Sequence, residues 1–182
     1  MIKAIKPKAF PLVVALLVVM LMAGLYISFL APKEMELGIS VDHAYASVDE
    51  MKKDAELIVE GTTLSQETIR YEGVLFTAST IKVEKVLNGE LQQEEITVLE
   101  TGGFDGKNHL TMEHNRVMDT SDRYILFLEK YEGSVVENDA YVITGAYQGR
   151  FKVNGDQLEP AEHVSKGLDN IDSKQELLTN IK

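Results

Sequence analysis

The stretch TASTIKVEKVLNG, residues 77–89, decides what kind of sheet this sequence can form. Side chains two positions apart point to the same face of a strand, and one face here carries Thr77, Ser79, Ile81 and Val83. Val86 is out of phase with this face. One extra residue near Glu84-Lys85 would restore the alternation, so we predict a β-bulge there.

Shorter runs with a strand pattern lie on both sides of this stretch. They fall in residues 57–60, 96–98, 124–128, 141–144 and 150–158, and residues 61–73 between two of them are expected to form a loop. Tyr124–Leu128 is apolar on both faces, which predicts the most buried strand. Asn154-Gly155 between two strand patterns predicts a hairpin.

These runs predict a mainly β fold, because five or six short strands follow one another without alternating helices. We expect a small antiparallel OB-like barrel, with a β-sandwich as the alternative. The bulge favours the barrel, since a small curved sheet needs such a break. Short flanking helices are predicted by two capping boxes, Ser47 with Glu50 and Ser173 with Glu176.

The N-terminal part of the chain has a different character. Ala9–Ala31 is a run of 23 uncharged residues. As a helix it would span about 34 Å, enough to cross a hydrocarbon core of roughly 30 Å. Lys3, Lys6 and Lys8 precede the run, so the positive-inside rule places the N-terminus in the cytoplasm. The alternative is a cleaved signal peptide, whose apolar core is usually only about 7–15 residues long.

The chain therefore divides into four expected parts. Residues 1–8 are a cytoplasmic tail, 9–31 a transmembrane signal-anchor helix, 32–46 a linker and 47–182 an extracytoplasmic β domain. This organisation predicts a single-pass protein of the cell membrane, with its N-terminus cytoplasmic and its C-terminal domain extracellular.

Composition excludes several classes of function. The chain has no cysteine, which excludes disulfides, thiol nucleophiles and cysteine zinc sites. Of the 18 basic residues three precede position 33, while all 29 acidic residues follow it, so the later part carries a net charge of about −14. Such a surface repels phosphate, and we expect no nucleic-acid partner.

Five segments, taken in order, resemble a known group of domains. They are AELIVEG at 55–61, IKVEKVLNG at 81–89, Gly102-Gly103, YILFL at 124–128 and YQGRF at 147–151. Over about residues 54–158 the chain is similar to uncharacterised bacterial exported and membrane-anchored domains that resemble the TIMP and netrin-module (NTR-like) OB-fold. The resemblance implies a five-stranded barrel and says nothing about catalysis. TIMPs insert an N-terminal cysteine at a protease zinc, and this chain has none, so that inhibitory mechanism does not carry over.

The polar segment 102–122 is the candidate for function, because it exceeds the usual connection of about 4–6 residues. Its expected interaction residues are Gly102, Gly103, Asp105, His109 and His114. His109, Glu113 and His114 are also candidate ligands of zinc or nickel. The spacing of the two histidines is not the i, i+4 helical one and HExxH is absent, so an ordinary polar loop is the competing interpretation.

We expect a non-enzymatic interaction or accessory module, without a cofactor, that binds a protein partner through the 102–122 loop. The first alternative is a metal-dependent hydrolase that uses His109, Glu113 and His114. The second is a protease inhibitor, by analogy of fold alone.

Overall fold

The computed structural model describes residues 10–41, 43–137 and 139–181, and the described chain forms two compact units that divide after Lys33. In the first unit α1 covers Phe10–Leu30 and carries no charged side chain. The expected cytoplasmic tail, residues 1–8, lies outside the described residues. A search of the described residues finds no helix long and apolar enough to cross a membrane.

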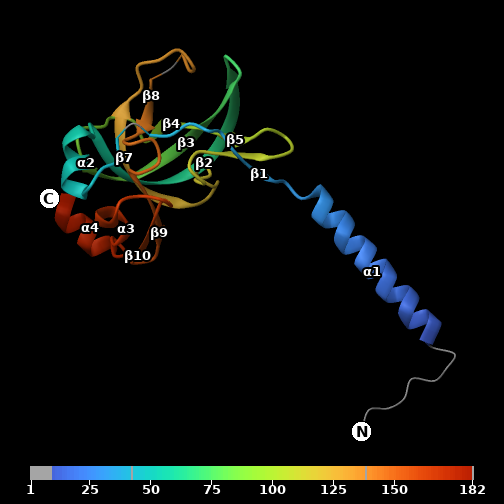
Figure 1. The fold of residues 1–182 in the computed structure, drawn as a ribbon. Coiled ribbons are helices and arrows are strands. Elements are labelled where there is room, and N and C mark those ends of the chain that lie inside the picture. Colours follow the sequence, from blue (N-terminus) through green and yellow to red (C-terminus); the bar gives the residue numbers. More distant parts are fainter. Residues whose placement is uncertain (1–9, 42, 138, 182) are drawn as a thin grey trace, which may run out of the picture. The chain divides into compact units, whose positions relative to one another are not determined.

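The second unit is mainly β (Figure 1). Its strands are β1 (Glu34–Glu36), β2 (Leu57–Tyr71), β3 (Val74–Asn88), β4 (Glu95–Thr101), β5 (Gly103–Phe104), β6 (His109–Thr111), β7 (Arg123–Lys130), β8 (Ala140–Ile143), β9 (Arg150–Asn154) and β10 (Gln157–Pro160). Its helices are α2 (Val48–Asp54), α3 (Lys166–Asp169) and α4 (Lys174–Ile181). The prediction of a mainly β fold with short flanking helices is confirmed.

The strands form two sheets. One has the order β1-β6-β5, and the other has the order β10-β9-β7-β2-β3-β4-β8. Because β7 also pairs with β8, the pairings that run from β7 through β2, β3, β4 and β8 return to β7. Within this circuit only the β4–β8 pair is parallel.

The predicted β-bulge is confirmed. Glu60 pairs with Lys85 and Gly61 with Val83, so Glu84 is the extra residue in β3. Such a residue bends the strand and increases its twist. β3 can therefore pair with β2 and β4 while the sheet curves.

The expected loop over residues 61–73 is wrong. β2 continues to Tyr71, and the chain reverses through the two-residue turn Glu72-Gly73. Most side chains in this half of β2 are exposed, so the segment lacks the apolar alternation that marks a strand with one buried face. The second half of β2 is thus a strand that the sequence pattern does not predict, and pairing with β3 stabilises it.

The described chain has three clusters of buried apolar residues, and β7 contributes to the two largest. Ile125 and Phe127 pack beneath α2 and α4, whereas Leu126 and Leu128 lie in the cluster lined by β2, β3 and β4. All residues of Tyr124–Leu128 are buried, which confirms the prediction that this strand is the most buried. A strand buried on both faces needs apolar side chains at successive positions.

Candidate functional site

Residues 102–122 are not an open loop. β5 and β6 pair with each other, and β6 also pairs in parallel with β1, which lies in the stretch expected to be a linker. Glu34 stands opposite His109 and Glu36 opposite Thr111. Main-chain pairing therefore brings two acidic residues from the start of the domain to the candidate segment.

Gly102 and Gly103 shape the entry into this segment. Their φ angles are +110° and +127°, a region that favours glycine. A Cβ on Gly103 would lie 2.1 Å from Oγ1 of Thr77, and that hydroxyl donates a 2.8 Å hydrogen bond to the carbonyl of Gly102. These two expected interaction residues therefore have a structural reason to be glycine.

Asp105 and His109 lie at the β5–β6 turn. The Asp105 carboxylate accepts hydrogen bonds from the backbone N–H groups of Lys107 and Asn108, at 2.8 and 2.6 Å. The bond from Asn108 and then that from Lys107 hold the pKa of Asp105 below its ordinary value. The His109 ring packs on Phe104 with ring centroids 5.0 Å apart.

Glu113 and His114 form a tight turn after β6. Met112 and Asn115 exchange two backbone hydrogen bonds of 3.1 and 2.8 Å around them. The φ angles of Glu113 and His114 are 46° and 65°, as in the hairpin turns that usually contain Asn-Gly. Non-glycine residues in this region cost about 1–3 kcal/mol each and persist where their surroundings fix them.

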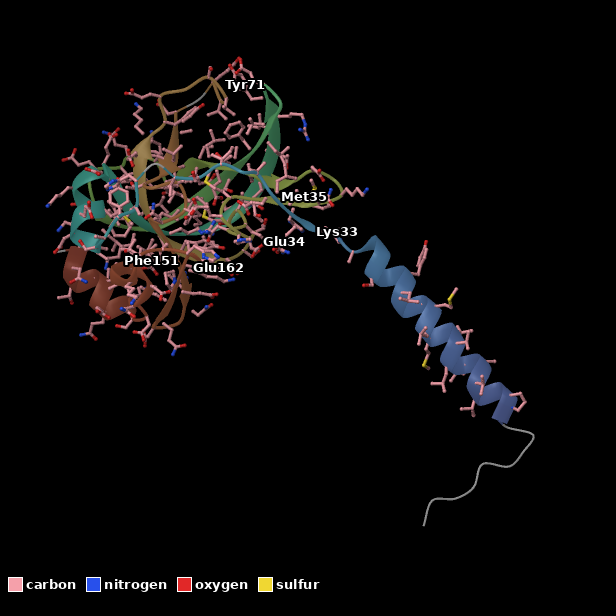
Figure 2. All side chains as sticks on the ribbon, viewed as in Figure 1. Lys33, Glu34, Met35, Tyr71, Phe151 and Glu162 are labelled. Carbon is pink, nitrogen blue, oxygen red and sulfur yellow. The ribbon has the colours of Figure 1, made fainter. Side chains whose placement is uncertain are left out.

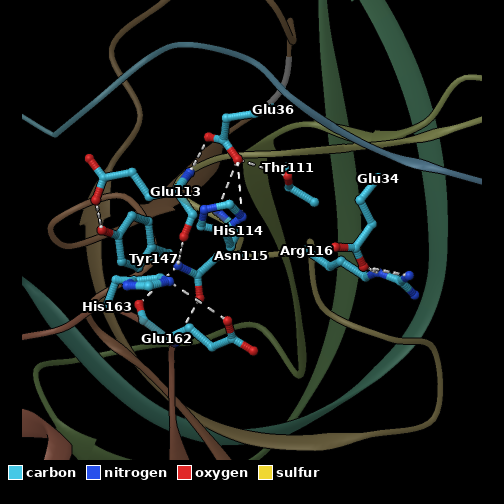
Figure 3. A network of polar contacts seen from close by, with 10 residues as sticks. All are labelled: Glu34, Glu36, Thr111, Glu113, His114, Asn115, Arg116, Tyr147, Glu162 and His163. Atoms are coloured by element: carbon cyan, nitrogen blue, oxygen red, sulfur yellow. Dashed lines mark hydrogen bonds and ion pairs between the residues drawn. The ribbon is translucent and has the colours of Figure 1, made fainter.

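The Glu36 carboxylate fixes this turn (Figure 3). It accepts hydrogen bonds from the backbone N–H groups of Glu113 and His114, at 2.5 and 3.0 Å, and from the Thr111 hydroxyl at 3.1 Å. Desolvation acts to raise the pKa of Glu36, but these bonds outweigh it and lower that pKa. The ionised carboxylate is thus the form that holds the turn.

Two further contacts fasten the turn to the rest of the domain. The buried Asn115 amide donates to the carbonyls of Glu113 and Glu162 and accepts from the N–H of Glu162. The Tyr147 hydroxyl donates to the Glu113 carboxylate. Burial, followed by this hydrogen bond, raises the pKa of Tyr147. The turn is therefore held from β1, from the segment after β10 and from Tyr147.

The structure brings His114 to a residue that the sequence did not single out, His163. Their ring centroids are 5.2 Å apart, and their side chains are 65% and 57% exposed. His163 also has a positive φ, 60°. Glu36, Glu162 and His163 escaped sequence analysis because they lie far from the 102–122 segment and form no motif with it.

The candidate metal ligands do not assemble into a site. Across residues 10–41, 43–137 and 139–181, no group of three histidine or acidic side chains is placed to hold a metal ion. His109 contacts Phe104, Glu113 contacts Tyr147, and His114 contacts His163. The geometry gives no support to a zinc or nickel centre at these three residues.

Two cavities flank the chain that follows the turn. One, of about 440 Å³, is lined by His114, Asp119, Lys152, Glu159 and Glu162 among others. The second, of about 330 Å³, includes Met112, Glu129, Val142 and Tyr147. Asn115, Arg116, Val117 and Arg150 line both. Residues 115–117 thus separate the two cavities, and we call this segment the strap.

A buried ion pair lies beneath this strap. Glu100 accepts a 2.8 Å hydrogen bond from Arg150, and their side chains are 5% and 11% exposed. Glu100 also accepts from the N–H of Met118. Burial raises the pKa of Glu100, against the opposing effects of the Arg150 charge and the Met118 N–H. The pair connects β4, β9 and the end of the strap.

Comparison with known proteins adds no assignment. No protein-family model matches the chain, and no curated protein matches it either. The site itself combines a cavity with a polar lining and a turn that hydrogen bonds fix in place.

We predict that Glu36→Ala lowers the free energy of unfolding by about 1 kcal/mol, because it removes the acceptor of two turn N–H groups at a partly exposed position. The loss should be visible in thermal unfolding of the solubilised full-length protein, together with faster exchange of the Glu113 and His114 amides. Because the pKa of Glu36 is lowered on folding, its contribution is present at neutral pH and is lost as the pH falls through its folded-state pKa.

The matched control is Glu34→Ala. In the part of the chain that the structure describes, the Glu34 carboxylate binds only the exposed side chain of Arg116, at 2.7 Å. It should cost less than about 0.5 kcal/mol. Equal losses from the two variants would show that Glu36 does not fix the turn.

Proposed function

We propose that this chain is a non-enzymatic, membrane-anchored interaction module whose extracytoplasmic domain binds a protein partner at the 440 Å³ cavity beside the Glu113–His114 turn. The observation that carries the proposal is the turn itself. It holds two non-glycine residues at positive φ, is fixed from three directions, and places His114 on the lining of the cavity. Backbone strain of this kind is concentrated at ligand clamps and functional sites.

The charges of the cavity suit a protein segment better than a small anion. Its lining includes Arg116 and Lys152 as well as Asp119, Glu159 and Glu162. Arg116 and Lys152 already have acidic partners, Glu34 and Asp122. A mixed, mutually neutralised surface recognises a partner through matched polar contacts, and such complementarity contributes chiefly to specificity.

The circuit of five paired strands supports the finer proposal of an OB-like barrel. In such barrels recognition is placed on the loops and on one face of the sheet. The 115–117 strap and the 113–114 turn belong to a connection between two strands of the circuit, β4 and β7. This position is typical of binding loops on a rigid scaffold.

A membrane anchor is the other part of the proposal. Supporting it in the sequence are the 23 uncharged residues Ala9–Ala31 and the three lysines that precede them. Their arrangement favours a cytoplasmic N-terminus and an extracytoplasmic β domain.

The test is site-specific photo-crosslinking in intact membranes. A photoreactive amino acid at Glu159 or Glu162, in the cavity, should give a discrete adduct with one partner. The same amino acid at Asp49 in α2, which lies outside the cavity lining, is the matched control and should give none. Adducts of equal yield at all three positions, or at Asp49 alone, would contradict the proposal.

A further inference from the structure

Beyond Thr63, β2 has a strand partner on one side only. β7 pairs with Leu57–Thr62, and Thr63 exchanges hydrogen bonds with Ser121 and Asp122. From Ser65 to Tyr71 the only strand that pairs with β2 among the described residues is β3. The Gln66 side chain bonds to the carbonyl of Met118 and to the Thr120 hydroxyl, so the opposite edge is open beyond Gln66.

The hairpin geometry identifies which main-chain groups lie on the open edge. Tyr71 and Val74 close the two-residue turn, so they are a hydrogen-bonded pair. In antiparallel strands hydrogen-bonded and non-hydrogen-bonded positions alternate. Counting back from Tyr71, the N–H and C=O groups of Arg70, Thr68 and Gln66 point away from β3. All three residues are exposed.

This half of the hairpin is long and accessible. Figure 2 shows Tyr71 at its far end, well away from the labelled core residue Phe151. The Tyr71 hydroxyl meets the Ser134 hydroxyl at 2.9 Å, so the segment between β7 and β8 lies beside the hairpin. Ile69, Ala78 and Val136 line a cavity of about 220 Å³ between them, which can receive a side chain.

The surroundings of the edge are acidic. The exposed glutamates nearby are Glu67, Glu72, Glu132 and Glu137. Arg70 is the one basic residue of residues 64–73. This charge disfavours a second copy of the same chain and favours a basic occupant. An open strand edge is itself a template for an added strand.

We infer that the open edge of β2 binds an extended, lysine- or arginine-containing segment of a partner protein, which adds to the sheet as a strand beside Glu67–Tyr71. Main-chain hydrogen bonds to Thr68 and its neighbours supply affinity, and the acidic surroundings and the small cavity supply selectivity. This surface is separate from the cavity beside the Glu113–His114 turn.

The test uses solubilised full-length protein and a synthetic peptide, acetyl-Lys-Val-Lys-Thr-Lys-Val-Lys-amide. Binding should protect residues 64–71 from amide hydrogen exchange. Thr68→Pro removes an outward N–H at an edge position that tolerates proline, and should weaken binding by about tenfold or more. Thr68→Ala, which keeps the N–H, is the matched control and should change affinity by less than about twofold.

Two control peptides keep the test independent of how well the variants fold. A peptide with glutamate in place of lysine, and one N-methylated at alternate residues, should each bind about tenfold more weakly or worse. Undiminished binding of either peptide or by Thr68→Pro would overturn the inference. Protection at residues 115–117 instead of 64–71, or a self-associated form that Thr68→Pro abolishes, would also overturn it.

Discussion

Arg150→Met is expected to lower the free energy of unfolding by about 3–5 kcal/mol at pH 8, because it leaves a buried carboxylate without its partner. Glu100 is 5% exposed, and in the described chain its bonded neighbours are Arg150 and the Met118 N–H. Methionine fills a similar volume without charge. The measurement is urea unfolding of the solubilised full-length protein.

The loss should depend on pH in a defined direction. Burial already raises the pKa of Glu100, and removal of the Arg150 charge, which opposes this rise, raises it further. A carboxyl group with a raised folded-state pKa stabilises the folded state below its unfolded-state pKa, and this contribution disappears as the pH rises through the folded-state value. The deficit of Arg150→Met should therefore be smallest below the ordinary carboxyl pKa of 4.5 and grow as the pH rises.

Two variants serve as controls for this prediction. Glu100→Gln/Arg150→Met keeps an acceptor for the Met118 N–H without a buried charge, so it should recover much of the loss and its pH dependence. Arg123→Met breaks the pairs with Glu60 and Glu84 at a site where Arg123 is 47% exposed, and should cost less than about 1 kcal/mol. A pH-independent deficit below about 1 kcal/mol for Arg150→Met would contradict the argument.

The sequence predicted the parts of the fold whose pattern is local. The bulge at Glu84 follows from a phase change within one strand, and the burial of Tyr124–Leu128 follows from successive apolar positions. The second half of β2 could not be found in this way, because its exposed polar residues leave no periodic signal. Its stability comes from pairing with β3, which a single strand does not encode.

The site was predicted only in part, for a related reason. The 102–122 segment was located by its length and polarity, and His114 does lie on a cavity. Glu36 and His163 reach the same place through the parallel β1–β6 pairing and through the chain after β10. These are contacts between distant parts of the sequence, so the spacing of residues within 102–122 does not predict them. Of the expected metal ligands, His109 contacts Phe104 within the same segment, whereas His114 contacts the distant His163.

Phe127→Ala is expected to cost about 3–5 kcal/mol, since truncation of a buried aromatic side chain removes its burial and leaves a cavity. Phe127 is fully buried, its ring centroid lies 6.0 Å from that of Phe151, and its backbone binds Gly149 and Thr144. Those backbone contacts hold β7 in place, so the cavity cannot collapse easily. At about 2–4 °C per kcal/mol, the melting temperature of the full-length protein should fall by roughly 6–20 °C.

The same substitution at Phe104 is the matched control, because it removes an aromatic side chain that is not buried. Phe104 is 43% exposed at the β5–β6 turn, where it contacts His109, so Phe104→Ala should change stability by no more than about 0.5 kcal/mol. If Phe104→Ala costs as much as Phe127→Ala, the β5–β6 turn is part of the cooperative core and the division of the domain into a buried β7 and a peripheral 102–122 segment is wrong. If Phe127→Ala alone lowers the melting temperature, the loss comes from burial of this β7 side chain in the core and not from removal of an aromatic ring as such.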